Sequence, residues 1–195
     1  MSSGVTPMFS SQSIASSGSG SLTWASPRLS TGLYNALRSW DFWIYLPSTT
    51  FQADLFTEVS STSTPANGDY TCSLAYNSGL WYVYLYAWTG SGTGTYCNYG
   101  AYFLWPTLNA PGWNHVFLQW NADGSISGGS NGTIVNSASS GGSTTPTSVG
   151  YGIGVLGMYN NAIPSGTYIQ EFRMCTGVNP FPTTGTYTVP PRQYG

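Results

Sequence analysis

His115 is the only histidine in this chain of 195 residues, and a search for catalytic chemistry starts there. A hydrolytic triad places a nucleophile and an orienting acid next to such a histidine. The neighbours of His115 are instead Trp113, Val116 and Phe117, in a run that is typical of a β-strand. We therefore expect a histidine that is hydrogen-bonded within a sheet, and no catalytic residue.

The six acidic residues would support glycoside hydrolysis only if two of them lay close together. Retaining enzymes hold their two carboxyl groups about 5–5.5 Å apart. Asp54 and Glu58 would share one face of an uninterrupted strand, but roughly 13 Å apart at the usual strand rise. Glu171 and Arg173 are expected to pair with each other or with neighbouring backbone. These spacings predict that the protein is not an enzyme.

Metal ligands are equally sparse. Calcium prefers six to eight oxygens with several carboxylates, whereas Asp69 and Asp123 fall in separate predicted loops without acidic neighbours. A calcium site made mainly from backbone carbonyls stays open as an alternative. Cys72, Cys97 and Cys175 have no zinc spacing, and we expect buried thiols in a reducing compartment, with a Cys72–Cys97 disulfide as the alternative. The sequence thus predicts no metal and no cofactor.

The best candidate binding site is a row of alternating tyrosines on one predicted strand, residues 80–87. The row consists of Tyr82, Tyr84 and Tyr86. The opposite face of the same strand carries Trp81, Val83 and Leu85. Tyrosine combines a large apolar ring with a polar tip, which suits both sugars and protein partners. The alternative is that these rings pack beneath a loop or against a second sheet.

Charged residues make up only 5% of the chain, compared with about 25% in an average soluble protein. There is no lysine, and four scattered arginines do not supply the cationic patch that nucleic-acid binding needs. No apolar run of 18 residues predicts a membrane span. The first residues lack the charged and apolar regions of a secretory signal, so we expect none.

Few charges also leave exposed sheet edges without their usual protection, because soluble β proteins block such edges with charged residues, above all lysine. Glycine, proline and bulges provide one alternative. We favour a second, in which neighbouring chains cover the edges, and this predicts a homo-oligomer or a larger assembly.

The elements that must position these residues are strands. Residues 40–46 alternate strictly, with Trp40, Phe42, Ile44 and Leu46 on one face, and Pro47 ends the run. Residues 113–135 predict a strand, a tight turn at Asp123-Gly124 and a returning strand. Asn77-Ser78-Gly79 predicts a second hairpin.

Three of these motifs together resemble laminin-G-like domains, which are jelly rolls of the concanavalin type. The motifs are Trp113-Asn114-His115-Val116 followed by Asp123-Gly124 and Asn131-Gly132, the opening strand before Pro47, and the closing strand Ile169-Gln170-Glu171-Phe172-Arg173. The resemblance covers roughly residues 22–178 and implies an all-β, two-sheet antiparallel jelly-roll sandwich. Residues 127–130 depart from the family, which usually has alternating apolar residues there. We expect that segment to be loose, bulged or packed backbone to backbone.

Three segments follow from this comparison. Residues 1–20 form an extended Ser/Gly-rich arm whose isolated apolar residues suit an arm lying across a partner. These anchors are Val5, Met8, Phe9 and Ile14. We expect residues 21–178 to form the laminin-G-like jelly-roll domain that the resemblance implies, and residues 179–195 to form a Pro-rich extended tail. Val178-Asn179-Pro180-Phe181 is similar to the ends of such modules in phage structural proteins.

The sequence therefore favours a non-enzymatic virion protein, specifically a capsid decoration or cement protein of a tailed bacteriophage, assembled in the host cytoplasm. Its partners would be other virion proteins, such as a major capsid protein, and further copies of itself. No nucleic acid and no membrane is expected as a partner. The alternative is a carbohydrate- or receptor-binding module of a phage tail or fibre, with a glycan as partner.

Overall fold

The computed structural model describes residues 14–15, 22–25, 38–59, 70–87, 99–105, 108–121, 125–137, 140–141, 153–156, 163–176 and 179–190. Every regular element within these ranges is a β-strand. Among the residues so described, no helix is long and apolar enough to cross a membrane.

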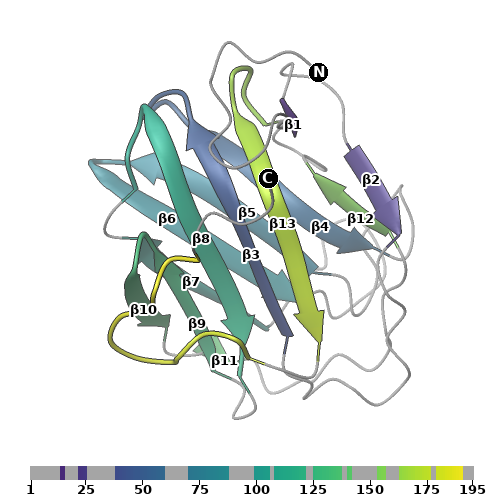
Figure 1. The fold of residues 1–195 in the computed structure, drawn as a ribbon, viewed down its shortest axis with the longest axis vertical. Helices are drawn as coiled ribbons and strands as arrows, with labels where there is room; N and C mark the ends of the chain where they lie inside the picture. The colour runs from purple at the N-terminus through teal and green to yellow at the C-terminus, as the bar shows by residue number, and fades with distance from the viewer. Residues whose placement is uncertain are drawn as a thin grey trace.

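The strands form two sheets that stack face to face (Figure 1). The six-stranded sheet has the order β1 (Ile14–Ala15), β13 (Tyr168–Thr176), β3 (Arg38–Leu46), β8 (Gly112–Trp120), β9 (Ile126–Ser130) and β10 (Thr133–Ser137). The seven-stranded sheet has the order β11 (Ser140–Gly141), β7 (Tyr99–Trp105), β6 (Leu80–Ala87), β5 (Tyr70–Asn77), β4 (Gln52–Val59), β12 (Ile153–Leu156) and β2 (Leu22–Ala25). Neighbouring strands run antiparallel throughout the described pairings. The predicted all-β, two-sheet antiparallel jelly-roll sandwich is confirmed.

The core lies between the sheets and follows the period-2 alternation of the strands. From β3 it receives Trp40, Phe42, Ile44 and Leu46, as predicted, and all four are fully buried. From the other sheet it receives Cys72 and Leu74 of β5, Trp81, Val83 and Leu85 of β6, and Trp105 of β7. Side chains at the intervening positions of these strands must therefore point to the two outer faces of the sandwich.

Register shifts interrupt two strands. In β13 the shift lies between Gln170 and Arg173, where Glu171 has a φ of 51°. In β4 it lies between Asp54 and Phe56. Such bulges reverse the alternation beyond them. The distance expected between Asp54 and Glu58 assumed an uninterrupted strand, and the register shift shows that β4 is interrupted between them.

Two hairpins have tight turns in which both central residues have positive φ. Ser78 and Gly79 have φ values of 51° and 88°, and Asn131 and Gly132 have values of 48° and 91°. This combination identifies type I′ turns, whose twist suits a two-residue hairpin. The predicted Asn77-Ser78-Gly79 hairpin is confirmed by the pairing of β5 with β6. The predicted Asp123-Gly124 turn lies outside the described residues, although the Asn121 amide donates to the Ser125 carbonyl at 2.8 Å across it.

Residues 127–130 form a regular, buried strand, so the expectation of a loose or bulged segment is wrong. The strand is closely packed, but aromatic side chains as well as backbone approach it. Gly129 shows why a side chain is missing there. A Cβ at Gly129 would lie 2.3 Å from Phe117 Cε1 and 2.7 Å from the Thr133 carbonyl oxygen. The same Cβ would lie 3.0 Å from Tyr187 Cε1, so the glycine leaves room both for neighbouring strands and for the C-terminal tail.

Two described segments near the ends of the chain, residues 14–15 and 179–190, meet the six-stranded sheet. Ile14 and Ala15 pair with Ile169 and Tyr168 of the same chain, whereas Val5, Met8 and Phe9 lie outside the described residues. Residues 179–190 cross β8–β10 as an extended segment, drawn in yellow in Figure 1, with a single bridge between Thr133 and Thr186. The segment limits at residues 20 and 178 stay predictions. Cys72 is a free, buried thiol, and Cys97 lies outside the described residues.

Candidate functional site

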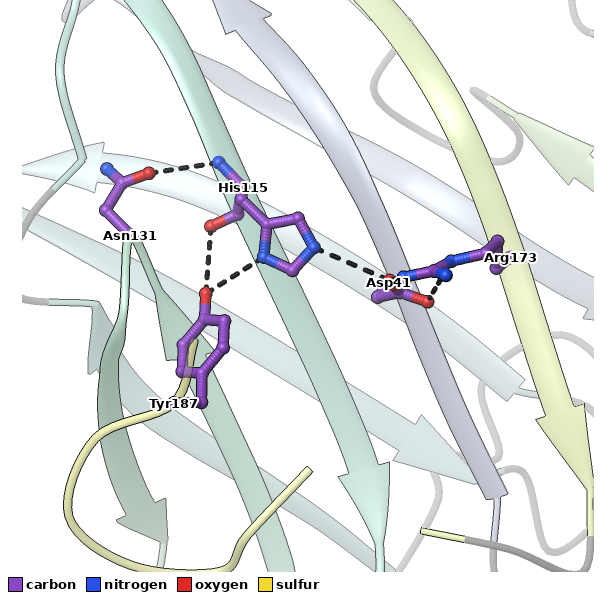
Figure 2. A network of polar contacts seen from close by, with 5 residues as sticks. All are labelled: Asp41, His115, Asn131, Arg173 and Tyr187. Carbon is purple, nitrogen blue, oxygen red and sulfur yellow. Dashed lines mark hydrogen bonds and ion pairs between the residues drawn. The ribbon is translucent and has the colours of Figure 1, made fainter. Parts of the chain in front are cut away.

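The outer face of the six-stranded sheet holds a polar network around His115 (Figure 2). The Nδ1 atom of His115 lies 3.0 Å from the Tyr187 hydroxyl oxygen. That hydroxyl also lies 3.4 Å from the backbone carbonyl oxygen of His115. As predicted, His115 lies within a sheet and is hydrogen-bonded, but the partner of its side chain is a tail residue 72 positions away.

Asp41 extends the network on the other side of the imidazole. Its Oδ2 atom lies 3.5 Å from Nε2 of His115. Both carboxylate oxygens accept from Nε of Arg173 at 3.1 Å, and a terminal nitrogen of the same guanidinium contacts Oδ2. A two-pronged arginine contact of this kind neutralises a buried carboxylate well. The sequence-based expectation for Arg173, a contact with Glu171 or local backbone, missed Asp41.

Asn131 ties the network to the tight turn after β9. Its side-chain oxygen accepts a hydrogen bond from the backbone amide of His115 at 3.0 Å, and its backbone amide donates to the backbone carbonyl of His115 at 2.9 Å. Its Nδ2 donates to Asn114 Oδ1 at 2.9 Å. The turn geometry and the histidine position are therefore fixed together.

The tail closes this face. The ring of Phe181 stacks on Phe117 with centroids 4.2 Å apart and planes 14° apart, and the ring of Tyr187 meets Phe117 edge-on at 4.9 Å. Gln119 Nε2 donates to the Phe181 carbonyl at 2.9 Å. Because His115 is only 1% exposed beneath this cover, its imidazole is not accessible to a substrate.

Two groups of this region titrate abnormally. Burial is the main cause that raises the pKa of the Tyr187 hydroxyl far above its ordinary value; the nearby Asp41 adds to the rise and a bond with Gly132 opposes it. Burial also raises the pKa of Glu171, the Arg173 charge lowers it, and the Asp41 charge raises it. The raised pKa of Tyr187 is consistent with its burial beside His115, whereas Glu171 and Arg173 lie nearer to solvent at the edge of the network.

The outer face of the seven-stranded sheet is different, because it holds an open groove of about 660 Å³. Its lining consists of Gln52, Ser73, Leu74, Ala75, Tyr76, Asn77, Tyr82 and Tyr84. Tyr82 and Tyr84 are half-buried and face away from the second sheet, whereas Trp81, Val83 and Leu85 of the same strand are in the core. Packing of these two rings against the second sheet, the alternative for this strand, is therefore excluded. The side chain of Tyr86 lies outside the described residues.

Polar groups surround these two rings. Ser73 lies opposite Tyr84 on the neighbouring strand, and its hydroxyl donates to Asp54 Oδ1 at 2.5 Å. Gln52 and Asn77 are exposed at the groove, so their amides are open to solvent. Within the described ranges no group of three or more metal-ligating side chains comes together.

Comparison with known proteins identifies the architecture alone. No family model and no curated protein matches this sequence. Among solved structures, the binding domain of botulinum neurotoxin serotype D matches with a TM-score of 0.55 and 15% identity, over 82% of this chain and 37% of that one. A structure named only as a receptor binding domain matches with a TM-score of 0.53 and 14% identity, over 83% of this chain and 38% of that one. The receptor binding domain of botulinum neurotoxin D matches with a TM-score of 0.52 and 12% identity, over 86% of this chain and 43% of that one.

The chain therefore spans about two fifths of each of these neighbours, 37%, 38% and 43%. At 12–15% identity the likeness shows the fold and assigns no site residue. Polysaccharide lyase structures also match, for example with a TM-score of 0.41 and 11% identity, too distant to support an argument about activity.

Proposed function

We propose that this chain is a non-enzymatic binding module that recognises a saccharide in the groove of Tyr82 and Tyr84. The observation that supports this proposal is the groove itself: two half-buried aromatic rings lie beside exposed amides on an open sheet face. Aromatic rings offer flat apolar surface, and a few placed polar groups orient a ligand. The sugar ring would lie against the tyrosines while its hydroxyls bond to Gln52 and Asn77.

The neighbouring fold supports binding over catalysis as the role. The neurotoxin structures are named as binding or receptor binding domains, and the sandwich matches about two fifths of each of them. In the present chain the one histidine is covered by the tail and bonded to Tyr187. The resemblance to laminin-G-like modules of phage structural proteins supports placing the protein on the virion, in a tail or fibre.

A second candidate is the capsid decoration protein favoured by composition. A chain with 5% charged residues and no lysine suits a surface covered by neighbouring subunits. The two candidates differ in which particle retains the protein. Co-purification with intact capsids would favour decoration, and co-purification with tails would favour the binding module.

A glycan array tests the proposal directly. The wild type should bind a subset of glycans, and a variant with Tyr82→Ser and Tyr84→Ser should lose that binding by at least about tenfold. The matched control is Tyr45→Ser, a half-buried tyrosine on the outer face of the six-stranded sheet, which should bind as the wild type does. Binding that survives the double substitution would refute the groove as the site.

A further inference from the structure

The charges around the groove limit what kind of saccharide it can hold. All eight residues that line it are uncharged. Of the four arginines, the two that fall in the described strands, Arg38 and Arg173, belong to β3 and β13 of the other sheet. The lining therefore offers hydrogen-bonding groups and rings, but no cation to an incoming ligand.

A carboxylate is hydrogen-bonded to one of the residues that line the groove. Ser73, a lining residue, donates to Asp54 Oδ1 at 2.5 Å, and Asp54 is only 7% exposed. The Asp54 charge acts on the neighbouring strand: burial raises the pKa of the Cys72 thiol, and the negative charge of Asp54 raises that pKa further. A charge so poorly exposed is weakly screened by solvent.

We infer that the groove selects a neutral saccharide and discriminates against glycans that carry a sialic or uronic acid; this inference rests on the proposed function. An acidic sugar would bring its own carboxylate toward Asp54 and lose water without gaining an ion pair. A neutral sugar avoids both penalties. Its hydroxyls can bond to the exposed amides of Gln52 and Asn77, while one face of its ring lies on Tyr82 or Tyr84.

The test uses matched pairs of oligosaccharides, each neutral glycan beside the same glycan extended by a sialic or uronic acid. The full chain should bind at least one neutral member, and its acidic counterpart should bind at least about tenfold more weakly. Asp54→Asn removes the charge and keeps an oxygen for the Ser73 hydroxyl. This variant should bind the neutral glycan within about twofold of the wild type and reduce the penalty on the acidic one about fivefold.

Gln52→Arg provides a second variant at an exposed position that does not depend on a buried residue. It should add binding of the acidic glycans, and high salt should remove that gain. This arm also decides the question if Asp54→Asn unfolds the protein, which thermal unfolding would reveal.

The possible failures are distinguishable. Wild-type binding of acidic members as tight as that of neutral ones, lost on Tyr82→Ser with Tyr84→Ser, would overturn this inference and leave the proposed function standing. Binding of no glycan in either series would overturn the proposed function, and this inference with it. A folded Asp54→Asn variant with unchanged discrimination would overturn the role assigned to Asp54.

Discussion

The outer face of the six-stranded sheet is covered over β8–β10 by the chain's own tail (Figure 1), whereas the outer face of the seven-stranded sheet holds an open groove. Both faces carry aromatic rings interspersed with polar side chains. On the first, the Tyr187 hydroxyl is bonded to His115, and Tyr187 is 8% exposed. On the second, Tyr82 and Tyr84 line the groove beside exposed Gln52 and Asn77.

The comparison shows that covering a face changes what its polar groups must do. Beneath the tail, burial would be expensive for Asp41 and His115 without partners, and each has partners: Arg173 on one side and Tyr187 on the other. On the open face, amides such as those of Gln52 and Asn77 remain available to a ligand. The closed face therefore contributes to stability, and we assign recognition to the open one.

The largest expected effect comes from adding one methyl group under the tail. Gly129→Ala would place a Cβ 2.3 Å from Phe117 Cε1, 2.7 Å from the Thr133 oxygen and 3.0 Å from Tyr187 Cε1. Because two of these neighbours are fixed by the sheet and the third by the tail, we expect a loss of about 3 kcal/mol in the free energy of unfolding. Urea denaturation would measure it.

The matched control is Gly79→Ala, in the turn between β5 and β6. That glycine has a φ of 88° but no atom within 4 Å of an added Cβ, so the substitution adds backbone strain alone. We expect a loss of about 1 kcal/mol. Equal losses at Gly79 and Gly129 would mean that the neighbours of Gly129 in the sheet and the tail yield to an added methyl group without cost.

An intermediate effect should distinguish aromatic rings on the two faces. Phe181→Ala removes the ring that stacks on Phe117 and should lower the free energy of unfolding by about 2 kcal/mol. Tyr82→Ala removes a half-buried ring from the open groove and should lower it by less than about 1 kcal/mol. A larger loss for Tyr82 than for Phe181 would reverse the comparison.

The smallest expected effect is on how the free energy of unfolding depends on pH, through the Tyr187 hydroxyl. Because the pKa of Tyr187 is raised in the folded state, that state keeps its proton when the unfolded chain loses it, near pH 10. The stabilisation is thus complete below about pH 10 and is lost as the pH rises above it.

Tyr187→Phe has no such titration and also lacks the bond to His115. It should be less stable than the wild type by about 1 kcal/mol at pH 8, and the difference should shrink by about 1 kcal/mol by pH 11. Unfolding curves at both pH values measure this change. A difference that stays constant across this range would show that the Tyr187 hydroxyl is not buried.

Local patterns were sufficient wherever one strand or one turn decides the outcome. The alternation of Trp40, Phe42, Ile44 and Leu46 identified the core face of β3, and Asn77-Ser78-Gly79 identified a hairpin. The same alternation separated Tyr82 and Tyr84 from the core residues of β6. Whether those tyrosines were open or covered could not be predicted, because the answer depends on where other segments run.

The sequence by itself determined that this is an all-β sandwich and which residues of its main strands enter the core, because side-chain alternation and turn chemistry act over a few residues. Only the tertiary structure decided the partners of the buried polar groups: Asp41 meets Arg173 across 132 positions, and His115 meets Tyr187 across 72. It also decided that the tail closes one face and leaves the groove of the other open. Contacts between residues so far apart in the sequence depend on how the sheets and the tail pack together, and a pattern of neighbouring residues cannot predict them.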